Sequence, residues 1–143
     1  MKLLISALLF SIATMATAQP SGKTVDMYEN PSCPCCKNWA TYMEKNGFQV
    51  RVHNVDDINV SRQKLGMPQK YGSCHTAVID GYLIEGHVPV SDIKRLLSEK
   101  PKAVGLAVPG MVVGSPGMEG PNPKPYQTLI IKPDGVSSVF ASH

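Results

Sequence analysis

The sequence of 143 residues contains no uninterrupted apolar run of the ~18 residues that a membrane-spanning helix needs. Lys and Arg form no run along the chain, and the formal net charge is only +3, which excludes a basic stripe for nucleic acid. Internal repeats and an acidic tail are also absent. What is present is a 43% hydrophobic content, ordinary for globular proteins, over a length that fits one compact domain.

The start of the chain has the parts of a secretory signal peptide. Lys2 is followed by an apolar stretch over 3–13, and Ala-Thr-Ala at 16–18 provides a cleavage site of the A-x-A type. We therefore expect residues 1–18 to be removed, leaving 19–143 as a single domain in an oxidising compartment. No Cys follows the cleavage site, so the sequence predicts no lipid anchor.

Alternating and helical patterns follow one another in the order of an α/β fold. The predicted elements are a strand over 24–29, a helix over 36–46, a strand over 48–55, a helix over 58–65, a hairpin over 76–85 and a helix from 91 to 100. A CxxC motif stands between the first strand and the first helix. A strand–CxxC–helix start followed by this order is the arrangement of thioredoxin-like proteins.

The rest of the chain departs from that arrangement. Residues 103–125 hold repeated Pro-Gly and Gly-Ser interruptions, so we expect an irregular segment that is either functional or partly mobile. Two alternating runs flank a Pro-Asp-Gly turn, which predicts a hairpin over 126–140. The predicted architecture is a thioredoxin-like α/β fold with an irregular Pro-, Gly- and Met-bearing segment and a C-terminal β-hairpin extension.

Three of the four cysteines stand within four residues. Cys33 and Cys36 have the CxxC spacing of redox dithiols and of half a zinc site, and Cys35 lies between them. A helix that begins here favours thiolates, which are soft ligands for Cu(I), zinc and iron–sulfur clusters. Cys74 precedes a strand, where thioredoxin-type enzymes usually carry a cis-proline that faces the CxxC loop. We expect all four thiols to converge, which favours a metal site.

The cysteines leave other interpretations open. A thiol–disulfide oxidoreductase would use Cys33 as nucleophile and Cys36 as resolving thiol, but the missing cis-proline counts against it. Two structural disulfides, Cys33–Cys36 and Cys35–Cys74, would be ordinary for a secreted protein, although the first closes almost no loop. A structural four-cysteine zinc domain is the third alternative.

Two methionines lie on turns rather than on predicted helices or strands. Met111 and Met118 each follow a Pro-Gly pair. A thioether is a soft ligand that suits Cu(I), although either side chain could instead pack its loop onto the core. Together the two methionines favour copper as the metal.

Two histidines are candidates for further ligands. His75 adjoins Cys74, and His87 follows the second strand of the predicted hairpin, so both fall at strand ends near the thiols. Either could instead be a hydrogen-bonded residue without a metal. His53 alternates along a strand and His143 is terminal, so we expect neither to act.

Five stretches of the sequence resemble the CopG-type copper-resistance proteins, a family long catalogued as a domain of unknown function, DUF411. In order along the mature chain they are NPSCPCCKNW at 30–39, SCHT at 73–76, GYLIEGHVP at 81–89, GLAVPGM at 105–111 and GSPGME at 114–119. One departure is Val112-Val113 after Met111, where a Pro is common in the family. It removes no candidate ligand.

The resemblance implies a periplasmic bacterial protein of thioredoxin-like fold that binds Cu(I) in copper resistance. It implies that a multinuclear copper–thiolate cluster is held by Cys33, Cys35, Cys36 and Cys74. Several bridged Cu(I) ions would also neutralise four thiolates in a low-dielectric pocket better than one ion. Outer ligands could come from His75, His87, Met111 and Met118.

The sequence is compatible with two roles of the bound copper. A redox role would interconvert Cu(I) and Cu(II), which would make the protein a copper oxidoreductase. A chaperone would instead pass copper to other periplasmic copper-handling proteins without redox chemistry. Both roles use the same residues, so the sequence does not separate them.

Overall fold

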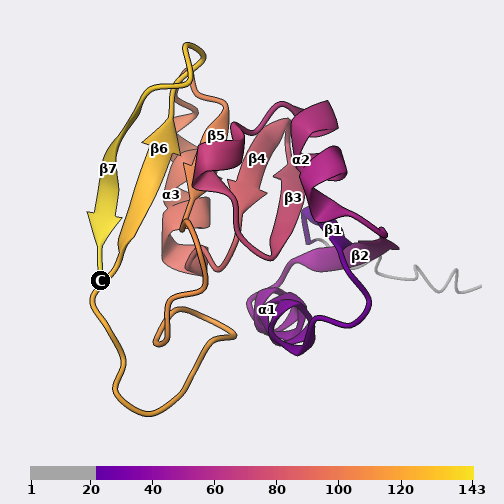
Figure 1. The fold of residues 1–143 in the computed structure, drawn as a ribbon. Coiled ribbons are helices and arrows are strands. Elements are labelled where there is room, and N and C mark those ends of the chain that lie inside the picture. The colour runs from indigo at the N-terminus through magenta and orange to yellow at the C-terminus, as the bar shows by residue number, and fades with distance from the viewer. Residues whose placement is uncertain (1–21) are drawn as a thin grey trace, which may run out of the picture.

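The computed structural model describes residues 22–143, so the predicted signal peptide at 1–18 lies outside the described residues. Figure 1 shows the elements along the chain. They are β1 (Thr24–Glu29), α1 (Pro34–Lys45), β2 (Gln49–Asn54), α2 (Ile58–Leu65), the 3-10 helix η1 (Gln69–Tyr71), β3 (His75–Ile79), β4 (Tyr82–Glu85), α3 (Val90–Glu99), β5 (Gly105–Ala107), β6 (Gln127–Ile131) and β7 (Ser137–Ser142). Within this range no helix has both the length and the apolar character needed to cross a membrane.

All seven strands form one mixed sheet in the order β2-β1-β3-β4-β5-β6-β7. β1 pairs in parallel with β2 and antiparallel with β3, and β3 and β4 form the predicted hairpin. The predicted C-terminal hairpin is present as β6 and β7, and β5 joins it to β4. The α/β class predicted from the sequence is confirmed.

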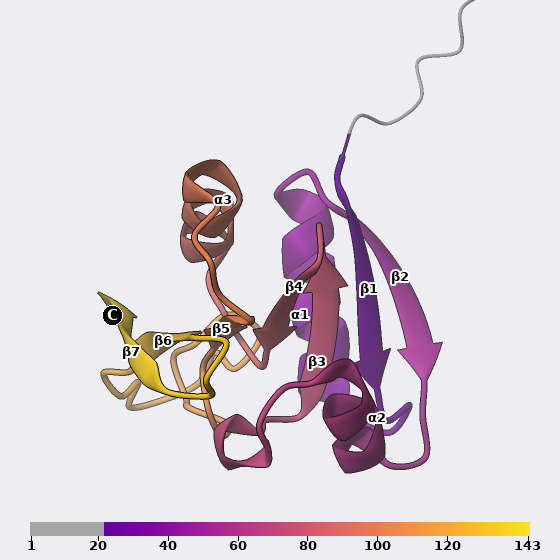
Figure 2. The ribbon, with the colours of Figure 1, turned by 90° about the horizontal axis from the view of Figure 1, so that it is seen from above.

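Helices cover both faces of the sheet (Figure 2). α1 and α3 pack on one face, where the fully buried side chains of Trp39, Met43 and Ile93 belong to the main core cluster. α2 and η1 lie over the other face, where Met67 and Tyr71 belong to a second cluster. Burial of the apolar stripe of each helix fixes the helices to the sheet, and it holds the first turn of α1 over the ends of β1 and β3.

Two predictions need correction, the start of α1 and the absence of a strand from the irregular segment. α1 begins at Pro34 and not at 36, because Pro suits the first turn of a helix and Cys33 takes the N-cap position. Cys35 and Cys36 therefore lie inside the first helical turn. In the segment predicted to be irregular, Gly105–Ala107 form β5, which is too short to produce a periodic pattern in the sequence.

Candidate metal centre

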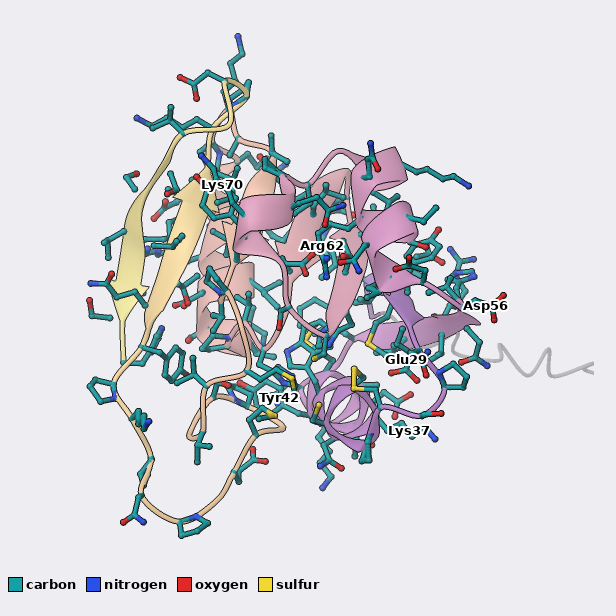
Figure 3. All side chains as sticks on the ribbon, in the orientation of Figure 1. Glu29, Lys37, Tyr42, Asp56, Arg62 and Lys70 are labelled. Atoms are coloured by element: carbon teal, nitrogen blue, oxygen red, sulfur yellow. A yellow bond between two sulfur atoms is a disulfide. The ribbon has the colours of Figure 1, made fainter. Side chains whose placement is uncertain are left out.

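The four cysteines meet at one end of the sheet. Cys33, Cys35 and Cys36 lie at the start of α1, and Cys74 directly precedes β3. Because β1 and β3 are antiparallel neighbours, the loop after β1 and the residue before β3 lie at the same edge. All four sulfur atoms lie within 4.8 Å of one another. Figure 3 shows several yellow sulfur atoms of cysteines and methionines around α1.

The four sulfurs are not chemically equivalent in this structure. Cys33 and Cys36 form a disulfide, while Cys35 and Cys74 are free thiols. The Sγ atoms of Cys35 and Cys74 lie 3.9 Å apart without a bond, so the second bridge of the two-disulfide alternative is absent. Four-thiolate coordination therefore requires that the Cys33–Cys36 bond be reduced first.

Burial controls the ionisation of Cys74. It raises the pKa of this thiol to about 12, and the neighbouring Cys35 thiol adds to the rise. The Cys74 thiol therefore carries its proton at neutral pH. A metal ion that binds Cys74 must displace that proton, so metal binding here releases protons.

His87 turns a ring nitrogen toward Cys74. Its Nε2 lies 2.9 Å from Cys74 Sγ, and its Nδ1 lies 2.7 Å from the backbone oxygen of Pro116. Since a carbonyl oxygen only accepts, Nδ1 carries the hydrogen and Nε2 of the neutral ring presents its lone pair to the sulfur. Burial lowers the pKa of His87 and thereby keeps the ring neutral. Metal-binding histidines commonly show this arrangement, with the second nitrogen donating to a carbonyl.

His75 lies deeper in the same site. Its side chain is fully buried, its Nδ1 lies 3.4 Å from Cys74 Sγ, and its Nε2 has no hydrogen-bond partner. The ring stands edge-on to His87 at 5.0 Å and tilted against Trp39 at 4.6 Å between centroids. Burial lowers the pKa of His75 well below its usual value, and the neighbouring His87 lowers it further. The structure thus brings both predicted histidines to Cys74.

A buried ion pair fixes the residues on either side of Cys74. Arg62 Nε donates to Glu85 Oε1 at 2.8 Å, and both side chains are almost completely buried. The same carboxylate accepts from Ser73 N at 2.7 Å and from the Thr76 hydroxyl, while Arg62 Nη2 donates to the Ser73 carbonyl. This network is not predictable from the sequence, since nothing in the spacing of Arg62 and Glu85 indicates that they meet.

The irregular segment that carries the two methionines is held near the site at two points. Gly110 is held by hydrogen bonds to Gly72 and Ser73, and Pro116 accepts from His87. Met111 is 55% exposed and Met118 is partly buried. That either thioether is a ligand stays a prediction.

Gly117→Ala is expected to loosen this segment from α1. Gly117 has φ +83°, and an added Cβ would lie 2.8 Å from Trp39 N and 3.0 Å from Cys35 O. Strain and overlap together should lower the free energy of unfolding by about 1–3 kcal/mol, measured by urea denaturation. Gly110→Ala is the control, because its φ is also positive but its Cβ would meet nothing within 4 Å. Equal losses in the two variants would contradict the packing role of Gly117.

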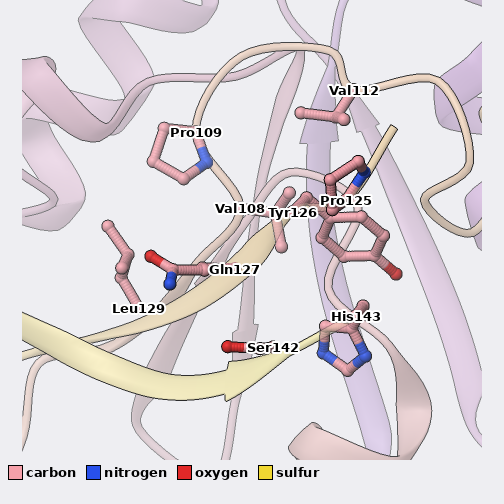
Figure 4. Close-up of a pocket in the computed structure, with 9 residues that line it drawn as sticks. All are labelled: Val108, Pro109, Val112, Pro125, Tyr126, Gln127, Leu129, Ser142 and His143. Carbon is pink, nitrogen blue, oxygen red and sulfur yellow. The ribbon is translucent and has the colours of Figure 1, made fainter. Parts of the chain in front are cut away.

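A separate pocket of about 520 Å³ lies between this segment and the C-terminal hairpin (Figure 4). It contains no candidate ligand, and its lining is Val108, Pro109, Val112, Pro125, Tyr126, Gln127, Leu129, Ser142 and His143. His143 bonds to Asp92 at 2.9 Å, and His53 bonds to Asp26 at 2.8 Å on the exposed surface. Neither histidine is among the residues brought together at the cysteines.

Comparisons with known proteins place this site in context. The family model described as "Protein of unknown function, DUF411" matches residues 71–118, which include Cys74, both candidate histidines and both methionines. Two solved structures are described as copper resistance protein CopG, form 2 and form 1. Each is 44% identical to this chain over 86% of its length, with 99% and 98% of their own chains covered and TM-scores of 0.81 and 0.80. No curated protein sequence matches the chain.

Proposed function

The chain belongs to the DUF411 family of CopG-like proteins, and we propose that it binds Cu(I) as its cargo in copper resistance. The residues that would hold the copper are Cys33, Cys35, Cys36 and Cys74. The observation that carries the proposal is that their four sulfur atoms, from two separate parts of the chain, lie within 4.8 Å of one another. Such a set of soft donors fits Cu(I).

Charge and spacing favour more than one copper ion per chain. Four thiolates around a single Cu(I) ion would leave a net charge of about −3 in a partly buried site, which is costly without further counter-charge. Several Cu(I) ions bridged by the same sulfurs remove that charge. The separations of 3.2 Å between the Sγ atoms of Cys33 and Cys35, and 3.9 Å between those of Cys35 and Cys74, allow neighbouring sulfurs to share ions.

The redox state of the CxxC pair would control loading of this site. Reduction of the Cys33–Cys36 disulfide takes up two electrons and two protons and frees two thiols for copper. In the reverse direction, two thiolates that form the disulfide give up two electrons, which can reduce two Cu(II) ions to Cu(I). This balance supports a role in interconverting Cu(I) and Cu(II) within the proposed function.

The proposal includes the setting as well as the chemistry. We assign the β2-β1-β3-β4 part of the sheet, with α1 and α3 on one face, to the thioredoxin-like class. The signal-peptide pattern at 1–18 supports export to the periplasm after cleavage. There the protein would exchange copper with other periplasmic copper-handling proteins.

Copper titration of the mature protein tests the proposal. We expect the fully reduced chain, under nitrogen, to take up more than one Cu(I) ion in competition with a chromophoric Cu(I) chelator, and to exchange bound zinc for copper. The readouts are metal content by mass spectrometry and loss of free thiols. Retention of one zinc ion in the presence of excess Cu(I) would instead identify a structural zinc domain. Absence of any bound metal would contradict the copper proposal.

A thiol–disulfide oxidoreductase is the second candidate, because the CxxC pair is a disulfide in this structure. Against it, Cys74 occupies the position that precedes β3, and the described residues contain no cis peptide bond there. Insulin reduction by metal-free protein separates the two functions. Substantial activity that Cys33→Ser abolishes would favour the oxidoreductase.

A further inference from the structure

We propose that Cys74, His75 and His87 form a second ligand set that binds one divalent metal ion while Cys33 and Cys36 are joined in their disulfide. The biological role of this second site rests on the proposed copper function. The metal binding itself is a property of the oxidised chain, in which the four-thiolate site does not exist.

The disulfide changes which donors are available. With Cys33 and Cys36 bonded to each other, only the thiols of Cys35 and Cys74 remain, 3.9 Å apart. Cys74 is the thiol with further donors around it. Its sulfur and one nitrogen each of His75 and His87 lie within 4.8 Å of one another, and no comparable pair of nitrogens meets Cys35 within the described chain.

The two imidazoles are prepared for a metal ion. His87 presents Nε2 to Cys74 Sγ at 2.9 Å, while its Nδ1 hydrogen is held by the Pro116 carbonyl. His75 Nδ1 lies 3.4 Å from the same sulfur. Both rings are fully buried beside the sulfur.

A pair of unsatisfied atoms gives independent support. Among the described residues, only two buried side-chain nitrogen or oxygen atoms lack a hydrogen-bond partner, His75 Nε2 and Glu29 Oε2. Glu29 and His75 are directly opposed across β1 and β3, so their side chains lie on the same face of the sheet. A metal ion on Nδ1 places the ring hydrogen on Nε2, where it becomes a donor on the same face of the sheet as the Glu29 carboxylate. Carboxylates often orient metal-binding histidines in this way.

The two ligand sets suit different ions. Four thiolates are a soft set that selects Cu(I), whereas two imidazoles and one thiolate are typical of Cu(II), zinc and cobalt(II) sites. One residue, Cys74, belongs to both sets. The disulfide state of the chain thus decides whether the site is matched to monovalent or to divalent metal.

Cobalt(II) is the probe for this inference, because a Co(II)–thiolate bond has a charge-transfer band in the near ultraviolet. The protein is prepared under nitrogen in its disulfide form, confirmed by two titratable thiols per chain. We expect one Co(II) ion per chain with this band. Cys74→Ser should abolish the band, and His87→Gln and His75→Gln should each weaken Co(II) binding at least about tenfold.

Three controls make the outcome decisive. Cys35→Ser should keep the band, His53→Gln should leave the affinity unchanged, and circular dichroism shows whether each variant is folded. If His75→Gln fails to fold, the Co(II) affinity of His87→Gln alone decides the test. Absence of the band, its equal loss in Cys35→Ser, or an unchanged affinity in His87→Gln would each overturn the inference. The outcome is separate from Cu(I) binding by the reduced chain, which uses no disulfide form.

Discussion

Cys74→Ser is expected to lower the Cu(I) affinity of the reduced protein by at least about 100-fold and to cut its copper content below one ion per chain. The other three cysteines belong to one helical turn and its N-cap, whereas Cys74 comes from the opposite side of the site. Its sulfur contacts Cys35 at 3.9 Å and both histidines, so it is the thiol that closes the site. A serine hydroxyl has nearly the same shape but is a poor ligand for Cu(I).

The measurement is copper content after desalting, together with competition against the Cu(I) chelator used for the parent protein. Ser32→Ala is the matched control, since Ser32 is an exposed neighbour of the motif and has no sulfur. Copper retained at the parent level in Cys74→Ser would contradict a site that includes Cys74. It would leave the three cysteines of α1 as the whole thiolate set.

The convergence of the cysteines could be predicted because it follows from chain order. A strand, a turn and a helix place Cys33, Cys35 and Cys36 at the end of β1, and the hairpin strand that pairs with β1 starts just after Cys74. Periodicity was sufficient to place both elements. The state of the sulfurs was not predictable, since spacing alone does not show that Cys33 and Cys36 are bonded while Cys35 and Cys74 are free.

Features that depend on tertiary contacts could not be predicted from the sequence. Arg62 lies on a short helix among polar neighbours, and Glu85 ends a strand, so ordinary patterns place both charges in solvent. In the structure they are buried against each other because α2 covers the face of the sheet beside β4. The tautomer of His87 likewise depends on Pro116, which is 29 residues away along the chain. β5 was missed because its three residues owe their strand conformation to β4 and β6.

Arg62→Met is expected to destabilise the fold by about 3–5 kcal/mol at neutral pH, because it leaves the Glu85 carboxylate buried without its counter-charge. Burial already raises the pKa of Glu85, and loss of Arg62 must raise it further. A group whose pKa is higher in the folded state than in the unfolded state favours folding at low pH, and this advantage is lost as the pH rises through the folded value. The loss of unfolding free energy in Arg62→Met, relative to the parent protein, should therefore become smaller as the pH falls from 7 toward the ordinary carboxyl pKa of about 4.5.

Urea denaturation across that pH range tests the argument, and two further variants interpret it. Arg51→Met makes the same exchange in an exposed ion pair with Asp26, so we expect little change in unfolding free energy. Arg62→Met combined with Glu85→Gln removes the stranded charge and should recover part of the loss and most of the pH dependence. Because this network holds Ser73 on both its N–H and its carbonyl, any folded Arg62→Met protein should also bind Cu(I) more weakly, and the double variant should not regain that affinity. If Arg62→Met loses the same unfolding free energy at pH 5 and at pH 7, Glu85 is not the group left unpaired.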